Sequence, residues 1–296
     1  MKEISVYRLN IGSCNGCDIE VVSVLASRFG VENLGVRVVD EPEKANALVL
    51  TGILNRKMVD VLREVYQKIQ EPKIVVAVGS CAVSSGIFGG SYAAGGVSDE
   101  VIPVTAYVPG CAPSPHEIIS AIAEAVALPK GEFSAPGGFR GLPKVNEEKC
   151  TGCGACVISC PALAIEMKDD GGRRKITYFY ERCISCGRCE EVCPEEAVKL
   201  EQKRHPASRK KEEMKDEADE PLAVCPVCGG ASLPEKQVKV ILERATFEAP
   251  LLMEFMGELE KTVRICQQCR RNGVRISEAK AALYRIGLKA MNNRQI

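Results

Sequence analysis

Hydrophobic runs with the spacing of β-strands alternate with stretches that have the spacing of helices in the first part of the chain. The strand-like runs are ISVYRLN, LGVRVV, ALVLTG, KIVVAVGS and VIPVTAYVP. The helix-like stretches span Asp18 to Arg28, Arg56 to Lys68 and Pro115 to Ala127. Because strands that alternate with helices form parallel sheets, this region is predicted to be an α/β domain with a doubly wound, flavodoxin-like parallel sheet.

Two stretches interrupt this patterning and divide the chain. Proline and glycine in SAPGGFRGLPKV break any helix or strand period. The segment KRHPASRKKEEMKDEADE carries six Lys or Arg and six Asp or Glu with hardly any apolar side chain, which predicts an exposed linker. The predicted organisation is a first domain over residues 1–128, a linker over 129–143, a second domain over 144–202, a charged linker over 203–220, and a third domain over 221–296 that ends in a helix.

Sixteen cysteines distinguish the composition of this 296-residue chain. Secreted disulfide scaffolds have such counts, but they carry a signal peptide, and this chain begins MKEISVYRLN without an apolar segment. The cysteines are therefore predicted to be reduced, in the cytoplasm. No run approaches about 18 consecutive apolar residues, which predicts no membrane span. The 39 basic and 39 acidic side chains balance, so no nucleic-acid partner is expected.

The cysteines fall into groups of four, eight and four along the chain, and the middle group contains two ferredoxin runs, CTGCGACVISCP and CISCGRCEEVCP. In this arrangement the first three cysteines of a run hold one four-iron cluster, and the fourth ligates the cluster of the other run. A pair of structural zinc sites is the minor alternative. A bacterial-type ferredoxin domain with two 4Fe-4S clusters is predicted. One ligand set is Cys150, Cys153, Cys156 and Cys193, and the other is Cys160, Cys183, Cys186 and Cys189.

The first four cysteines each follow a strand-like run. Cys14 and Cys17 follow ISVYRLN, Cys81 follows KIVVAVGS, and Cys111 follows VIPVTAYVP. The carboxyl ends of parallel strands meet at one edge of the sheet, where such folds bind ligands. Glycines beside these cysteines let the backbone pass close to a bound group. The four thiols are therefore candidate ligands of a further cluster, with four buried structural thiols as the alternative.

The last four cysteines, Cys225, Cys228, Cys266 and Cys269, form two C-x-x-C pairs. Two such pairs make one tetrahedral thiolate site, although the segment between them is longer than the roughly 15 to 20 residues of a simple zinc ribbon. A structural Zn²⁺ in a small zinc-ribbon-like domain is predicted, because the metal supplies energy that a small domain needs to fold. Rubredoxin-like iron or a further cluster are the alternatives.

Hydrolytic chemistry finds no support in the sequence. The chain has two histidines, His116 directly after a proline and His205 in the charged linker, and His116 is predicted to start a helix. The chain is therefore predicted to be an electron carrier, and the substrate reaction is expected to occur on a partner.

Two family resemblances follow from these motifs. Residues 1–128, through CNGCDIE from Cys14, VGSCA around Cys81 and VPGCAP around Cys111, resemble the small subunit of membrane-bound, energy-converting nickel–iron hydrogenases, which is related to the chain-B subunit of respiratory complex I. Residues from about 144 to 296 resemble the two-cluster ferredoxin subunit of formate hydrogenlyase, which is chain I-like. Together, the two resemblances imply that the chain is a fusion of two neighbouring subunits.

The resemblance implies that Cys14, Cys17, Cys81 and Cys111 ligate a proximal four-iron cluster beside a hydrogenase-type large subunit. That partner would hold the nickel–iron centre, and this chain would transfer electrons without a catalytic residue of its own. Electrons would come from ferredoxin or from a formate or carbon monoxide dehydrogenase module, pass through three 4Fe-4S clusters, and reduce protons to hydrogen. Membrane-arm subunits would hold the complex on the cytoplasmic face of the cell membrane.

The alternative keeps the clusters and replaces the partner with a large subunit that lacks nickel and reduces a sulfur compound or quinone. Quinone-reducing complex I relatives carry adjacent cysteines in the first motif, whereas two residues separate Cys14 from Cys17, which favours the hydrogenase. Glu20 matches a carboxylate on the complex I side of the family. A proton-path or cluster-tuning role and a solvent-facing helix position both stay open for it.

A third hypothesis makes the C-terminal domain a module that tethers the chain to nucleic acid or to a regulator. The 12 basic against 7 acidic residues over 221–296 are a modest excess, which disfavours a phosphate-driven interaction. Arg270, Arg271 and Arg275 are predicted to lie on a solvated helix face, with a basic patch that docks a protein or lipid surface as the alternative.

Overall fold

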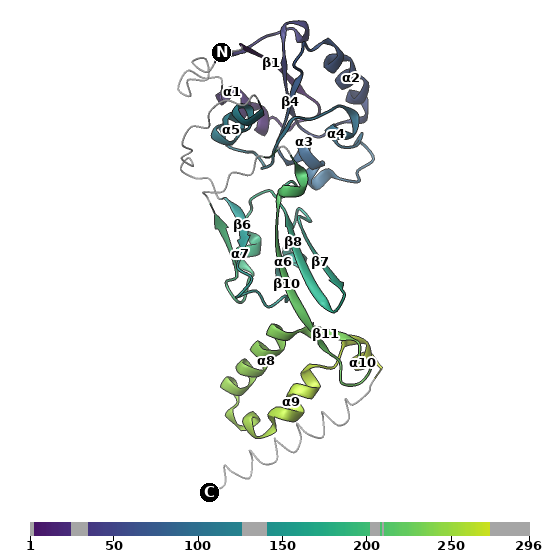
Figure 1. Cartoon of the computed structure of the whole chain (residues 1–296), viewed down its shortest axis with the longest axis vertical. Helices are drawn as coiled ribbons and strands as arrows, with labels where there is room; N and C mark the ends of the chain where they lie inside the picture. Colours follow the sequence, from purple (N-terminus) through teal and green to yellow (C-terminus); the bar gives the residue numbers. More distant parts are fainter. Residues whose placement is uncertain (1–2, 25–34, 126–140, 202–207, 209, 273–296) are drawn as a thin grey trace.

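The computed structural model is elongated, and three parts follow one another along its long axis (Figure 1). It describes residues 3–24, 35–125, 141–201, 208 and 210–272. The predicted C-terminal helix and most of the linker over 129–143 lie outside the described residues.

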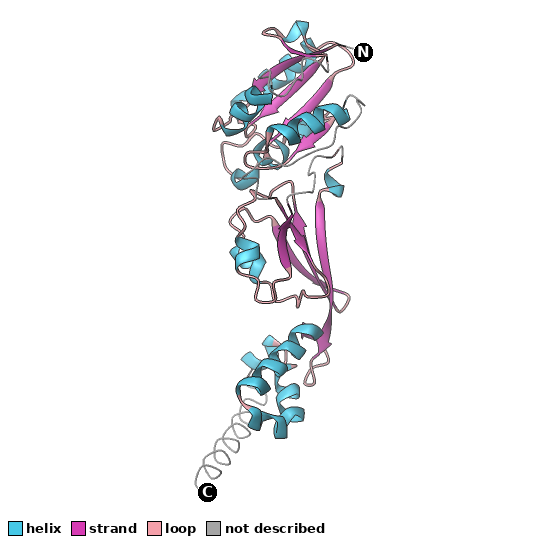
Figure 2. Cartoon of the chain, turned by 90° about the vertical axis from the view of Figure 1, so that its left-hand side faces the viewer, coloured by secondary structure: helices cyan, strands magenta, loops and turns pink. Residues whose placement is uncertain are grey.

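The first part is a parallel sheet between helices (Figure 2). The sheet has five strands. Its strand order, β2-β1-β3-β4-β5, is the flavodoxin-like order, so the predicted parallel-sheet α/β domain is confirmed. Helices α1 and α5 cover one face through Val21 and Ile118, and α2 covers the other through Leu62. The elements are β1 (Ile4–Asn10), α1 (Gly16–Val24), β2 (Val36–Val38), η3 (Pro42–Lys44), β3 (Ala47–Thr51), η4 (Arg56–Met58), α2 (Val59–Lys68), β4 (Ile74–Val78), α3 (Ser80–Ser84), η5 (Gly86–Phe88), α4 (Ser98–Val101), β5 (Ala106–Val108) and α5 (Pro115–Ala125).

One strand is shorter than its hydrophobic run predicts. In VIPVTAYVP, Val101 is the last residue of α4, and β5 occupies Ala106–Val108. Pro103 lies between them, and a proline has no N–H to donate to a strand ladder. The apolar run is therefore divided between a helix end, a turn and a strand.

The second part consists of antiparallel strands and short helices. A four-stranded sheet has the order β11-β10-β8-β7, in which β11 (Ala231–Pro234) comes from the third part, and β6 pairs with β9 in a second sheet. The ferredoxin-like character predicted for this part agrees with these paired hairpins and with its two cysteine runs. The elements are β6 (Leu142–Val145), α6 (Ala155–Ser159), β7 (Ile165–Asp170), β8 (Arg173–Phe179), α7 (Arg188–Glu191), β9 (Val198–Glu201), η6 (Lys211–Glu213) and β10 (Lys215–Val224).

The charged segment over 203–220 differs from the exposed linker that its composition predicts. From Lys215 onward it forms β10, which pairs along the whole of β8, and Ala218 is buried in the core. Lys175 of β8 forms an ion pair with Glu217 of β10 at 3.3 Å. Opposite charges on neighbouring strands stabilise the pairing, so here the charge pattern belongs to a strand.

The first and second parts share one buried core. Val83 and Tyr107 of the first part belong to the same cluster of buried side chains as Met214 of the second. The backbone of Tyr107 also donates to and accepts from Ser208, at 2.9 and 3.2 Å. The two parts are therefore packed against each other as one continuous body.

The third part is a small helical unit attached to the end of β10. Its core contains Val238, Leu242 and Val263. Lys236 forms an ion pair with the buried carboxylate of Glu220. Among the described residues, no helix is long and apolar enough to cross a membrane. The elements are β11 (Ala231–Pro234), α8 (Glu235–Glu248), η7 (Pro250–Phe255), α9 (Met256–Val263) and α10 (Gln267–Arg271).

Candidate metal centres

Four thiols converge at the carboxyl edge of the parallel sheet. Cys14 and Cys17 follow β1, Cys81 lies in the first turn of α3 after β4, and Cys111 follows β5. Burial first, and then the nearby charges of the other three thiolates, raise the pKa of Cys17 to about 12. Four thiols within electrostatic reach of one another could together ligate one metal group.

Glycines at this edge leave room beside the sulfur atoms. Gly79 has a φ of 90°, and a Cβ there would lie 2.4 Å from Cys17 Sγ. A Cβ at Gly16 would lie 3.7 Å from Cys14 Sγ. Only glycine fits at Gly79, so the backbone at this edge is shaped around its thiols. These residues fit a thiolate-bound cluster.

Polar side chains that the sequence analysis did not single out hold the first cysteine loop. Asn10, at the end of β1, accepts hydrogen bonds from the N–H groups of Gly12 and Ser13 at 2.9 and 2.8 Å. The buried carboxylate of Asp18 accepts from Thr51 Oγ1 at 2.9 Å and from Asn10 Nδ2 at 3.2 Å. A signal for them exists in the sequence, because each polar residue stands where a hydrophobic strand or cysteine motif ends.

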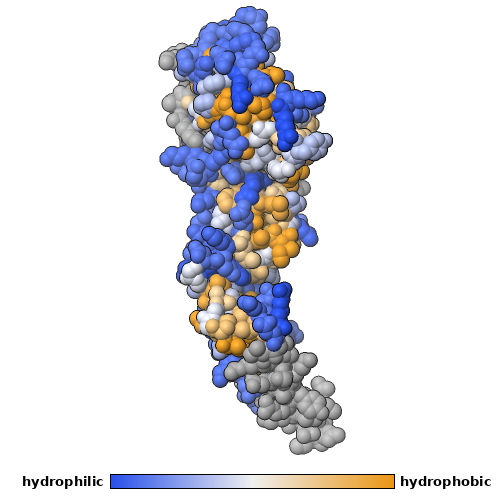
Figure 3. Space-filling model, turned by 90° about the vertical axis from the view of Figure 1, so that its right-hand side faces the viewer, coloured by the Kyte–Doolittle hydropathy of each residue, from blue (hydrophilic) through white to orange (hydrophobic). Residues whose placement is uncertain are grey.

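The first site opens to the surface. Cys14 and Cys111 are exposed, whereas Cys17 is buried. Ile19 and Ile87, close in sequence to these thiols, are exposed large apolar residues. Figure 3 shows apolar side chains at the surface of the first and middle parts. Exposed apolar residues beside a ligand set are typical of a protein interface.

The ferredoxin runs bring together the first of their predicted sets. Burial raises the pKa of Cys156 to about 11, and the charges of Cys150, Cys153 and Cys193 raise it too. The hydroxyl of Tyr178 donates to Cys156 Sγ at 3.3 Å and opposes that shift. Cys193 comes from the second run, so the run-crossing arrangement is present in the positions of these four thiols.

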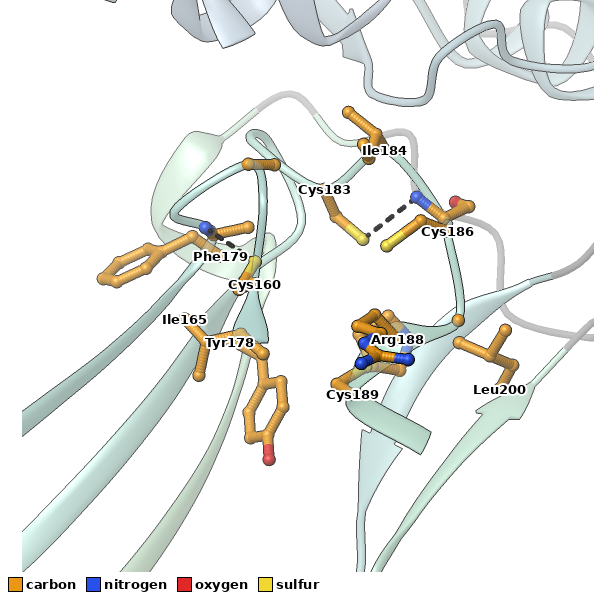
Figure 4. A pocket seen from close by; sticks show the side chains of 15 residues that line it. Cys160, Ile165, Tyr178, Phe179, Cys183, Ile184, Cys186, Arg188, Cys189 and Leu200 are labelled. Carbon is orange, nitrogen blue, oxygen red and sulfur yellow. Dashed lines mark hydrogen bonds between the residues drawn. The ribbon is translucent and has the colours of Figure 1, made fainter. Parts of the chain in front are cut away.

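The other predicted set lines an apolar cavity (Figure 4). Cys160, Cys183, Cys186 and Cys189 all face it. The N–H of Ser185 donates to Cys183 Sγ at 3.4 Å. Burial raises the pKa of Cys183 to about 11. An apolar, thiol-lined cavity with backbone donors fits an iron–sulfur cluster, since hydrogen bonds to sulfur and burial set a cluster's potential.

Four thiols gather again in the third part. The ligand atoms of Cys225, Cys228, Cys266 and Cys269 lie within 4.8 Å of one another, and Cys228 Sγ is 3.7 Å from Cys266 Sγ. A tetrahedral site with metal–sulfur bonds of about 2.3 Å has edges of about 3.8 Å, so this spacing fits one ion. Burial raises the pKa of Cys225, but the N–H groups of Cys266, Cys228 and Val227 outweigh it and lower the pKa to about 6.

The remaining candidate residues have simpler surroundings. His116 lies in the first turn of α5, as predicted, and Glu20 is half-buried on α1. Arg270 donates to the carbonyl oxygens of Val263 and Ile265 at 2.8 and 2.9 Å, so this guanidinium closes the end of α9. His205 and Arg275 lie outside the described residues.

Comparison with known proteins separates the chain into two matched segments. Residues 14–125 match the family described as NADH ubiquinone oxidoreductase, 20 Kd subunit. Residues 149–217 match the 4Fe-4S dicluster domain, which extends into the segment predicted as a charged linker.

Three relatives each match less than half of this chain. The chain is 50% identical over 121 residues to an uncharacterized protein of Methanocaldococcus jannaschii, which covers 41% of this chain and 81% of that protein. It is 37% identical to the probable membrane-bound hydrogenase subunit mbhJ of Pyrococcus furiosus, over 43% of this chain and 78% of that one. It is also 37% identical to formate hydrogenlyase subunit 7 of Escherichia coli, over 45% of this chain and 52% of that one.

Proposed function

Because the chain belongs to the family of the 20 Kd subunit of NADH ubiquinone oxidoreductase and carries a 4Fe-4S dicluster domain, we propose that it conducts electrons through three clusters to a partner large subunit. The chain is an electron-transfer subunit of a complex I-like hydrogenase or reductase with iron–sulfur clusters. Each cluster, when bound, accepts and releases one electron. The partner would collect two electrons and combine them with two protons to form hydrogen at a nickel–iron site.

One observation carries this proposal: twelve thiols gather in three groups of four within one continuous body. The first set lies at the sheet edge, where Cys14 and Cys111 are exposed. The two ferredoxin sets are neighbours. The pKa of Cys189 in the second set is raised first by burial, then by the charge of Cys183 in the same set, and then by the charge of Cys156 in the first set. Ligand sets that adjoin one another suit stepwise electron transfer.

The donor and the location of the complex belong to the same proposal. Ferredoxin, or a formate or carbon monoxide dehydrogenase module, would be oxidised at the ferredoxin-like part. Ile158 and Leu163 of this part are 89% and 71% exposed, and they flank Cys160 in the sequence. Such apolar exposure suits docking of a donor. Membrane-arm subunits would hold the assembly on the cytoplasmic face of the membrane.

The four-cysteine site of the third part would hold a structural Zn²⁺. Its thiols come from two segments that are far apart in the sequence, the end of β10 and the start of α10. Zinc bound there would close the third part into one unit with Cys225 and Cys269 buried. Lys236 of this unit also donates to the carbonyl oxygen of Glu147, just before the first ferredoxin run. A structural role beside the clusters follows from this placement.

The second candidate function retains the electron path and changes the acceptor. The family description names a ubiquinone oxidoreductase, which favours a reductase whose large subunit lacks nickel. The two residues between Cys14 and Cys17 favour the hydrogenase instead.

The test is a metal analysis of the anaerobically purified native assembly. About twelve iron and about one zinc per chain are expected from three four-iron clusters and one zinc site. About one nickel, together with hydrogen evolution, supports the hydrogenase. About twelve iron without nickel favours the second candidate function, a sulfur- or quinone-reducing complex. About eight iron contradicts a cluster at the sheet edge, and Cys111→Ala, expected to lose about four iron, is the matched variant.

A further inference from the structure

Helix α3 joins the first part to the ferredoxin-like part through two serines. Ser84 Oγ donates to the carbonyl oxygen of Glu181 at 2.8 Å. Ser80 Oγ donates to the carbonyl oxygen of Cys183 at 2.9 Å. Both bonds connect residues about a hundred positions apart in the sequence. The two bonds differ in their acceptor residue, because Cys183 is a candidate ligand and Glu181 is not.

Within the first site, Ser80 links two of the three segments that carry candidate ligands. It directly precedes Cys81, and its Oγ accepts a hydrogen bond from the N–H of Gly110, the residue before Cys111, at 3.1 Å. Its own N–H donates to the carbonyl oxygen of Gly110 at 2.9 Å. One hydroxyl group therefore bonds both to the sheet edge and to the ferredoxin loop.

The surroundings of this hydroxyl exclude water. Ser80 is 1% exposed, and its neighbours Ala82 and Val83 belong to the buried cluster that the two parts share. A buried hydroxyl with a donated and an accepted hydrogen bond has one favoured orientation, because breaking either bond leaves a polar group unsatisfied. Its position therefore fixes the Cys183 loop relative to Cys81.

We propose that Ser80 is a positioning residue for electron exchange between the set at Cys14, Cys17, Cys81 and Cys111 and the set at Cys160, Cys183, Cys186 and Cys189. This inference rests on the proposed function. An electron that left a reduced group held by the second set would reduce a group held by the first set. No bond is made or broken. The route from Cys183 to Cys81 contains one hydrogen bond and otherwise covalent bonds.

The test compares Ser80→Ala with Ser84→Ala in the full chain, prepared anaerobically with its clusters. Both variants remove one hydrogen bond to the ferredoxin-like part, and only Ser80→Ala removes the bond to a ligand residue. We expect Ser80→Ala to reduce the spin–spin splitting between neighbouring reduced clusters in the electron paramagnetic resonance spectrum. We also expect electron equilibration after rapid reduction to slow severalfold, whereas Ser84→Ala behaves as the wild type.

The iron content separates failure of this inference from failure of the proposed function. A wild-type chain with fewer than about twelve iron contradicts the proposed function itself. Full iron and unchanged splitting in Ser80→Ala, or equal losses in both variants, overturn the role of Ser80 alone. If Ser80→Ala loses iron, the Ser80→Thr variant tests the role of the hydroxyl, because threonine keeps this group. Recovery of iron and splitting supports the proposal, and any other result with Ser80→Thr overturns it.

Discussion

The first part and the ferredoxin-like part hold their thiols in opposite ways. In the first part, the two buried clusters of the sheet consist of aliphatic side chains, with Cys17 as the one thiol among their described members. In the ferredoxin-like part, Cys150 and Cys156 are themselves core residues, and other ligand cysteines pack against that core. A core built from ligands depends on the group they hold, whereas a sheet edge does not. One site is added to a folded scaffold, and the others are part of their scaffold.

Removal of all metal should produce the largest effect and test this contrast directly. When iron is withdrawn anaerobically from the full chain with a chelator, we expect the ferredoxin-like part to unfold and the first part to stay folded. Hydrogen–deuterium exchange read by mass spectrometry follows both at once. Amides of β8 and β10 should lose protection, while those of β3 and β4 keep it. Equal loss in both sheets would contradict the contrast.

The next largest effect is expected from Gly79→Ala at the sheet edge. The new Cβ would lie 2.4 Å from Cys17 Sγ, at a φ of 90° that only glycine adopts easily. We expect about four of about twelve iron to be lost and the free energy of unfolding to fall by about 1–3 kcal/mol.

Gly90→Ala is the matched control for Gly79→Ala. Gly90 has a φ of 79°, and a Cβ there meets nothing within 4 Å. The Gly90→Ala variant should retain its iron, because the substitution introduces similar backbone strain without a contact to a sulfur atom. Iron analysis and denaturant unfolding measure both effects, and full iron in Gly79→Ala would refute the expectation.

Tyr178→Phe sharpens the comparison from the ferredoxin side. The variant removes the hydrogen bond to Cys156 Sγ, which favours the more negative, reduced state of a bound cluster. We expect the midpoint potential of one cluster to fall by roughly 40 mV, which corresponds to about 1 kcal/mol for one electron. Tyr180→Phe is the control, because its hydroxyl donates to the carbonyl oxygen of Pro143. A potentiometric titration in which both variants shift alike would argue against the role of Tyr178.

The smallest effect concerns the helix that follows Cys111. Burial raises the pKa of Glu117 above its ordinary value of 4.5, although the N–H and hydroxyl of Ser114 oppose this shift. The native state therefore binds the proton more tightly than the unfolded chain. Its contribution to stability is present below pH 4.5 and is lost as the pH rises through the raised pKa.

We therefore expect Glu117→Gln to flatten the pH dependence of the free energy of unfolding just above pH 4.5. Denaturant unfolding at several pH values measures this slope. Glu64→Gln, at a largely exposed position on α2, should leave the slope unchanged. An unchanged slope in Glu117→Gln would show that burial does not raise the pKa of this carboxyl.

Local patterns predicted much of the first part, because its strands are buried runs and its α2 is amphipathic. The helix-like stretch from Arg56 to Lys68 corresponds to η4 and α2, and ISVYRLN corresponds to β1. The charged segment that became β10 was missed. Its apolar positions are few, and its stability comes from pairing with β8, which lies some forty residues earlier. Such long-range pairing leaves little mark on a local window.

The sequence by itself determined which thiols are candidate ligands, because the cysteine spacing defines the members of each run. The alternation of strands and helices also predicted the parallel sheet whose edge carries the first four thiols. Only the tertiary structure decided how these sites meet. It placed Ser80 between Cys81, Gly110 and the carbonyl oxygen of Cys183, and it made Tyr178 a donor to Cys156. A serine or a tyrosine carries no spacing signal, since its partner is chosen by packing between segments far apart in the chain.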